Sequence, residues 1–384
     1  MRRYSADDEE RVTAQFCIRE WERSGLLESS QSARLEAELQ VDLRRTNNFL
    51  RGVLFLFTGL IVAASVLLTI TVFDLDDELL LATTTGIAGI LFFALLECLV
   101  SRFRLYRFGV EEAFAVAAAV LLSVSGAAIA STLRGNRPGE FPALVALCIG
   151  ALSAFGIYRR FGYVYAAFAA MICAAGIPFQ MALSAEVQRF LVAAMLTLVV
   201  VVVRSKRLQN ASEHPGDEYG IIPASAWAGL YFVLNLQMSF GRIEGWFYWG
   251  TYVMIWFLPI IGLRLALRVK DRALMDVSLA MALVTLATNK PYLGLSRQPW
   301  DPILLGIFLM AAVITLRRWL SKGPDSRRYG FTPVRLLTGD SRLLTFVSTA
   351  SAAFQPEVPA PTSAPGKPDF SGGRSGGAGA SGSF

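Results

Sequence analysis

Residues 52–73 read GVLFLFTGLIVAASVLLTITVF, an apolar run with no charged side chain. The hydrocarbon core of a bilayer takes roughly 20 apolar residues of helix, so this run has the length of one membrane span. Similar runs follow as far as Leu320. Backbone groups in lipid have to be satisfied internally, and the alternating pattern of a transmembrane barrel is absent, so these runs are expected to be helices. The sequence therefore predicts an all-α, polytopic transmembrane helical bundle.

The block from Gly52 to Leu320 divides by length into about ten spans. The expected spans are 52–73, 78–100, 111–132, 141–158, 161–178, 187–203, 222–240, 245–267, 272–290 and 302–320.

Basic residues predict the orientation, because loops on the cytoplasmic side carry an excess of Lys and Arg. The N-terminal segment and every second break hold the basic clusters: Arg44, Arg45 and Arg51; Arg102, Arg104 and Arg107; Arg159 and Arg160; Arg204, Lys206 and Arg207; Arg264, Arg268, Lys270 and Arg272; Arg317, Arg318 and Lys322. The opposite breaks hold only Arg134, Arg137, Arg189, Arg242, Lys290 and Arg297. This alternation predicts an even number of spans with both termini in the cytoplasm.

The chain divides into four parts by composition. Residues 1–50 are expected to form a small cytoplasmic helical hairpin, and residues 51–320 the transmembrane bundle. Residues 321–354 are expected to be cytoplasmic or to lie at the membrane interface. Residues 355–384 are rich in Pro and Ala, then in Gly and Ser, which predicts a disordered tail.

Within the expected hairpin, an apolar stripe recurs at helical spacing at Val12, Phe16, Cys17 and Trp21. We expect this stripe to pack against the second helix or the membrane surface, and a groove that docks a partner is the alternative. Gly25 is suited to end the first helix in a left-handed conformation.

Composition excludes several classes of function. Of the residues, 54% are hydrophobic, and the net charge of +6 comes from bases in the cytoplasmic breaks, which favours contact with anionic membrane lipids over nucleic acid. The single histidine, His214, and four cysteines without CxxC spacing indicate no metal site, and no cofactor is expected. No GxSxG, HExxH or Walker motif is present, so no catalytic residue is assigned.

Polar groups inside expected spans are the candidate site residues, since burying charge in a membrane is costly. Glu97 and Asp276 are the acids selected, although each lies about one helical turn from a cytoplasmic basic cluster and is able to pair there. Asn235 and Gln237 are candidates for interhelical hydrogen bonds or a polar substrate contact. Trp256 lies deeper than the aromatic belt expected at the outer interface, and it is the candidate for an aromatic wall.

The stretch Trp21-Glu-Arg-Ser-Gly-Leu-Leu, followed by Gln31 and Arg34, resembles the start of a group of bacterial predicted membrane proteins of unknown function. In that group a short helical pair with a W…GL(I/L)…R pattern precedes many membrane helices. The resemblance covers roughly residues 10–130 and implies a multi-pass architecture in a bacterial inner membrane. It supplies no catalytic residues.

Two functions compete on this sequence. The first is a non-enzymatic membrane scaffold or binding protein that engages a protein partner through the N-terminal hairpin or the C-terminal tail. The alternative is a small-molecule or lipid transporter, which rests on Glu97, Asp276, Asn235 and the aromatic residues near Trp256. An intramembrane enzyme acting on lipid or glycan is a third possibility, because such enzymes carry few motifs.

Overall fold

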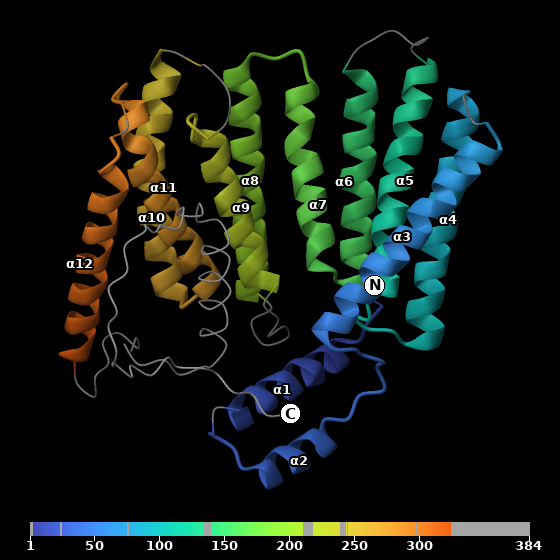
Figure 1. The fold of residues 1–384 in the computed structure, drawn as a ribbon, viewed down its shortest axis with the longest axis horizontal. Coiled ribbons are helices and arrows are strands. Elements are labelled where there is room, and N and C mark those ends of the chain that lie inside the picture. The colour runs from blue at the N-terminus through green and yellow to red at the C-terminus, as the bar shows by residue number, and fades with distance from the viewer. Residues whose placement is uncertain are drawn as a thin grey trace, which may run out of the picture. The chain divides into compact units, whose positions relative to one another are not determined.

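A computed structural model describes residues 3–23, 25–74, 77–133, 140–209, 218–238, 243, 245–296 and 298–323. These residues contain helices and no β-strand (Figure 1). The elements are α1 (Ala6–Arg23), α2 (Ser29–Glu38), α3 (Asn48–Val72), α4 (Glu78–Phe103), α5 (Val110–Leu133), α6 (Phe141–Phe161), α7 (Val164–Gly176), the 3₁₀ turn η1 (Ile177–Gln180), α8 (Ala185–Gln209), α9 (Glu218–Leu234), α10 (Trp246–Val269), α11 (Arg272–Tyr292) and α12 (Asp301–Ser321). The prediction of an all-α chain is confirmed over these residues.

Within the described ranges, seven helices are long and apolar enough to cross a bilayer: α3, α4, α5, α6, α8, α10 and α12. The other expected spans coincide with helices that are shorter or more polar. Helix α7 ends at Gly176 and continues only as the turn η1, and α9 has 17 residues and ends at Leu234, before the expected end of its span. Helix α11 has 21 residues but carries Asp276 and Lys290. Seven apolar helices are compatible with a multi-pass membrane protein.

Several expectations concern residues outside the described ranges. These are the tail at 355–384, nearly all of the segment 321–354, His214, and the outer-break residues Arg134, Arg137, Arg242 and Arg297.

The buried apolar side chains form two clusters. One lies among α8, α9, α10 and α11 and includes Leu196, Trp227 and Ile255. The other joins α4 to α7 with residues near the N-terminus and includes Leu96 and Phe161. Helix α7 contacts α6 in the second cluster, and also α8 and α9 in the first.

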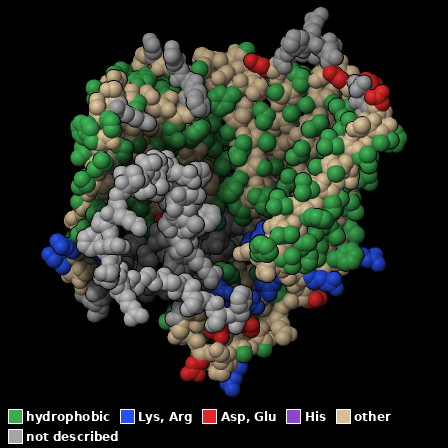
Figure 2. Space-filling view, viewed as in Figure 1, with side chains coloured by type: hydrophobic (Ala, Val, Ile, Leu, Met, Phe, Trp, Pro, Cys, Tyr) green, Lys and Arg blue, Asp and Glu red, His purple; other side chains and the backbone are tan. Residues whose placement is uncertain are grey.

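Helix α3 packs on α5 and is otherwise exposed, and α12 buries none of its apolar span. Figure 2 shows hydrophobic side chains along α3, with Lys and Arg gathered in the lower half of the view. Exposed apolar helix faces of this kind match the surface that lipid covers in a membrane.

The apolar stripe expected on the first helix is only partly buried: Val12 packs against the second cluster and Cys17 is half-buried. In α1 the buried side chains are Gln15 and Ile18, whereas Phe16 and Trp21 are exposed. Gln15 is buried because its amide donates to the carbonyl of Leu39 after α2, at 2.6 Å. A polar contact to the segment after α2, together with burial of Ile18, sets the inward face of α1. Phe16 and Trp21 are not buried against α2, and their packing on the membrane surface stays a prediction.

Close approach of α10 to α9 and α11 depends on Gly262. A Cβ at this position would lie 2.5 Å from Nε1 of Trp227 and closer still to Oγ of Ser278. Contacts this short are not sustained, so the neighbouring side chains would have to move.

We expect Gly262→Ala to lower the free energy of unfolding by about 1–3 kcal/mol, the usual cost of overpacking a core. Thermal unfolding in detergent, followed by tryptophan fluorescence, measures the change. Gly250→Ala is the control, because the same helix has open space at that position, and there the substitution is expected to be neutral or stabilising by up to ~1 kcal/mol. Equal effects at the two glycines would contradict the close approach.

Candidate functional site

The loop between α4 and α5 has an unusual backbone that brings three segments together. Arg104 and Arg107 both have a φ of 51°, in the left-handed region that non-glycine residues seldom adopt. Gly109 has a φ of 107°, and a Cβ there would collide with the carbonyl oxygen of Arg51 in α3. Only glycine fits this position, and its absent side chain lets the start of α5 lie directly against the first turn of α3.

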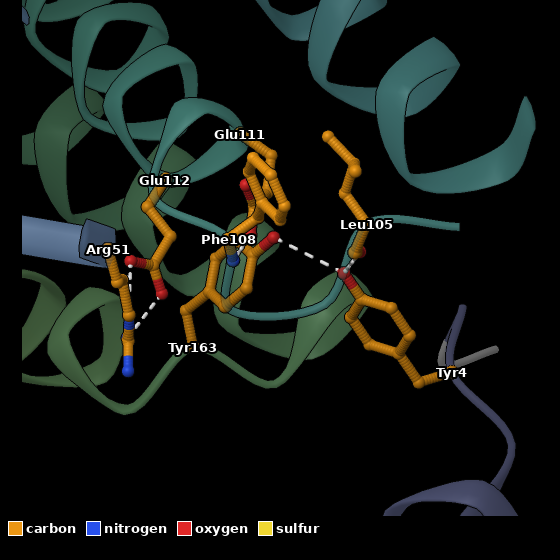
Figure 3. Close-up of polar contacts among 7 residues, drawn as sticks. All are labelled: Tyr4, Arg51, Leu105, Phe108, Glu111, Glu112 and Tyr163. Atoms are coloured by element: carbon orange, nitrogen blue, oxygen red, sulfur yellow. Dashed lines mark hydrogen bonds and ion pairs between the residues drawn. The ribbon is translucent and has the colours of Figure 1, made fainter. Parts of the chain in front are cut away.

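The N-terminus docks on this loop through Tyr4. The Tyr4 hydroxyl donates to the carbonyl of Leu105 at 2.7 Å and lies 3.4 Å from the hydroxyl of Tyr163 (Figure 3). The Tyr4 ring meets the Tyr106 ring edge to face, with 4.9 Å between centroids. Tyr4 is only 5% exposed, and burial raises the pKa of its phenol, so the group stays a neutral donor.

The segment that follows α2 docks on the same loop. The Arg44 amide donates to the carbonyl of Arg104, and the Tyr106 amide donates to the carbonyl of Arg44, each at 3.0 Å. These bonds form an isolated parallel bridge between Arg44 and Leu105. Asp42 adds an ion pair to Arg104 at 2.8 Å.

Both ends of the segment that carries α1 and α2 are therefore fixed to one loop. We call this contact the N-terminal joint and define it as Tyr4, Arg44, Leu105, Tyr106 and Tyr163. Closing a chain segment at both ends removes conformational freedom from everything between them. The joint makes α1 and α2 a fixed part of the bundle.

Two carboxylates at the start of α5 lie beside the joint. Glu112 accepts two bonds from Arg51 of α3, one of them from Nε at 2.8 Å, and its side chain is 5% exposed. Glu111 is fully buried and accepts from the amide of Phe108 at 2.6 Å (Figure 3). Its second oxygen, Oε2, has no hydrogen-bond partner among the described residues.

The two acids predicted from the sequence lie near helix ends and are paired. Glu97 accepts from Arg160 of α6 at 2.6 Å, and Nε of Arg3 lies 3.4 Å away. Asp276 lies 3.7 Å from Arg272, one turn earlier in α11, and its side chain is 61% exposed. Neither acid is a deeply buried isolated charge, so each geometry is that of a structural ion pair.

Asn235 is fully buried just after the end of α9. Its amide nitrogen donates to the hydroxyl of Tyr231 at 3.1 Å and to Oγ1 of Thr288 at 3.2 Å. Tyr231 in turn lies 2.8 Å from Oγ1 of Thr285. The network joins α9 to α11 by side chains whose polar groups satisfy one another.

The other two predicted residues lie nearby but differ in exposure. Gln237 is exposed; its amide reaches the Tyr248 hydroxyl at 3.3 Å, and its backbone amide donates to Oδ1 of Asn235 at 3.2 Å. Trp256 is half-buried, and its indole nitrogen has no hydrogen-bond partner in the described part of the chain. The structure brings Asn235 and Gln237 together, but it does not join the five predicted residues into one site.

Sequence reasoning missed Arg51, Glu111, Glu112 and the N-terminal docking of Tyr4. The two glutamates sit in the first turn of an apolar helix, where acids are common because they complement the helix dipole. A signal was present, since Gly109 lies two residues before a pair of acids at the start of an expected span. Tyr4 gave no signal, because its partners lie 101 and 159 residues away.

Among the described residues, no group of three or more His, Cys, Asp or Glu side chains is placed to hold a metal ion. The polar groups beside the joint are engaged mainly in ion pairs and backbone hydrogen bonds. Their arrangement fixes the position of α1 and α2 on the bundle.

Comparison with protein-family models, with curated proteins and with solved structures finds no match. The resemblance of the N-terminal region to bacterial membrane proteins stays a prediction.

We expect Tyr4→Ala to release α1 and α2 from the bundle. Removing a buried aromatic ring costs about 3–5 kcal/mol, whereas Tyr4→Phe removes only the hydroxyl that contacts Leu105 and Tyr163, about 1–3 kcal/mol. Hydrogen exchange of residues 6–38 measures the release, with fast exchange expected for Tyr4→Ala and a smaller change for Tyr4→Phe. Phe16→Ala is the control, because Phe16 is exposed. Unchanged protection in Tyr4→Ala would show that the joint does not depend on this ring.

We expect Asn235→Ala to destabilise the protein by about 1–3 kcal/mol, because it removes one member of a buried polar network. Asp276→Asn is expected to change stability by less than ~0.5 kcal/mol, because the Asp276–Arg272 pair is exposed. Chemical denaturation in detergent compares the two. A larger effect at Asp276 would give that acid a role beyond its surface pair.

Proposed function

We propose that this chain is an integral protein of a bacterial inner membrane. It has about ten spans, and both of its termini lie in the cytoplasm. Within that frame it acts as a non-enzymatic binding or scaffold protein. Its α1 and α2 helices present a rigid surface to a protein partner, and the N-terminal joint holds that surface in a fixed position.

The observation that carries this proposal is the exposure of large apolar side chains on the docked N-terminal helices. Phe16 is 66% exposed, Trp21 is 44% exposed, and Leu26, just after α1, is 67% exposed. Exposed aromatic side chains on a docked helix are typical of surfaces that bind another protein.

Charge favours a protein partner over the lipid surface. Residues 5–42 contain ten acidic and four basic side chains, although the whole chain has a net charge of +6. An acidic surface repels the anionic headgroups of a cytoplasmic leaflet. It attracts a partner that surrounds an apolar contact with Lys or Arg.

The orientation is supported by where the basic residues lie on the helices. Arg51 is in the first turn of α3, Arg102 is in the last turn of α4 and Arg160 is in the last turn of α6. Arg51 and Arg160 bind residues beside the joint. The positive-inside rule then assigns this side to the cytoplasm.

A transporter is the second candidate, favoured by the early end of α9. A helix that stops short within a membrane leaves carbonyl groups to be satisfied by neighbours, as in the broken helices of carriers. Arg189 of α8, which is buried, donates to the carbonyl of Val233 at 3.0 Å, and Asn235 is the first residue after α9. A substrate would contact the buried polar groups around Asn235.

We expect the double variant Phe16→Ser/Trp21→Ser to lose a stoichiometric protein partner while its stability stays within ~0.5 kcal/mol of the parent, because both side chains are exposed. Native mass spectrometry of complexes extracted from source membranes detects the partner. Phe57→Ser is the control, since Phe57 is an exposed apolar residue on α3 and is expected to face lipid. Retention of the partner by the double variant, or its loss in the control, would reject this surface. A retained small molecule that is lost in Asn235→Ala would favour the transporter.

A further inference from the structure

A pocket of about 500 Å³ opens beside the joint, at the first turns of α3 and α5. Its size is within the range of small-molecule sites, roughly 300–1,000 Å³. Its walls are lined by Asn48, Arg51, Gly52 and Phe55 of α3, Glu112 of α5 and Tyr165 of α7. Most of this lining is apolar, and the polar groups gather around Arg51 and Asn48. The pocket therefore combines an apolar surface with a small polar corner.

Arg51 has N–H donors at this corner that do not bond to Glu112. A guanidinium carries five N–H donors, and Arg51 uses Nε and one terminal nitrogen on Glu112. Its remaining nitrogen points away from Glu112 (Figure 3). The planar fork is already held rigidly by Glu112, so a second anion is able to bind the outer edge at little entropic cost.

We propose that this pocket binds the headgroup of a zwitterionic glycerophospholipid, with the lipid phosphate on the outer edge of Arg51 and on the side chain of Asn48. The proposal rests on the membrane location under the proposed function but does not require a protein partner. The acyl chains run along Phe55 and the exposed face of α3.

The charges around the pocket select the class of headgroup. Glu112 neutralises the charge of Arg51, so the corner has no net charge to offer a polyanion. A headgroup that carries its own cation keeps the corner balanced. Two aromatic residues, Phe55 and Tyr165, line the same pocket, and aromatic rings attract ammonium groups. Phosphatidylethanolamine fits this description better than phosphatidylglycerol.

The test is native mass spectrometry of the full chain released from nanodiscs that contain equal amounts of phosphatidylethanolamine and phosphatidylglycerol. We expect one retained lipid per chain, enriched in phosphatidylethanolamine over the bulk mixture. Arg51→Lys keeps a positive charge opposite Glu112, with one donor group in place of the planar fork, and it lacks the second edge. We expect it to lower lipid occupancy about tenfold, the effect of losing one charge-assisted hydrogen bond.

Arg102→Lys is the matched control, because Arg102 is an exposed arginine on the same side of the bundle and lies outside the pocket. It is expected to retain the lipid, whereas Asn48→Ala is expected to weaken binding. Equal occupancy in Arg51→Lys and Arg102→Lys would overturn the proposal. Enrichment of phosphatidylglycerol, or displacement of the lipid by inorganic phosphate, would overturn it as well. We expect variants that lose the lipid to keep binding a protein partner through α1. The lipid proposal and the partner proposal are therefore tested independently.

Discussion

The hydrogen bond from the Tyr4 hydroxyl to the Leu105 carbonyl is part of a constraint on which the rest of this structure depends. The same short loop also pairs with the backbone of Arg44, so the chain is held before α1 and after α2. The position of the N-terminal helices, the first turn of α3 and the start of α5 all follow from this loop. Its left-handed residues and Gly109 are the local backbone features that make such a junction possible.

Buried polar side chains are satisfied in two ways in the bundle. Beside the joint, Glu97 and Glu112 are neutralised by arginines from other helices, close to helix ends. Among α9, α10 and α11, neutral amides and hydroxyls around Asn235 satisfy one another. An ion pair becomes costly when one partner is lost, because the other charge stays behind in a poor solvent. A neutral network leaves no unpaired charge behind when one member is lost.

The sequence was sufficient to predict that the apolar runs are helices, because a long apolar run between charged breaks has few other structures available to it. It also located Glu97 beside a basic cluster, although not the partner Arg160, which lies 63 residues away. Exposure on α1 was not predictable from spacing, because the inward face depends on the Gln15 contact to Leu39 as well as on hydrophobicity. The pocket at Arg51 was also beyond the sequence, since its walls come from three separate helices. Local patterns determine the elements, whereas contacts between distant residues determine the site.

The distance along the chain between Tyr4 and Tyr163 has a consequence for biosynthesis. The two residues are 159 positions apart, and a ribosome adds about 5–20 residues per second, so roughly 8–30 s pass before the second residue exists. During that interval α3 to α6 leave the ribosome while the acidic N-terminal helices have no completed docking site. The backbone pairing of Arg44 and the bond from Tyr4 to Leu105 are able to form once residue 106 exists, whereas the contact to Tyr163 has to wait for α5 and α6 to be made. The joint is therefore completed in two steps, and its last contact, to Tyr163, forms only when α7 begins to emerge.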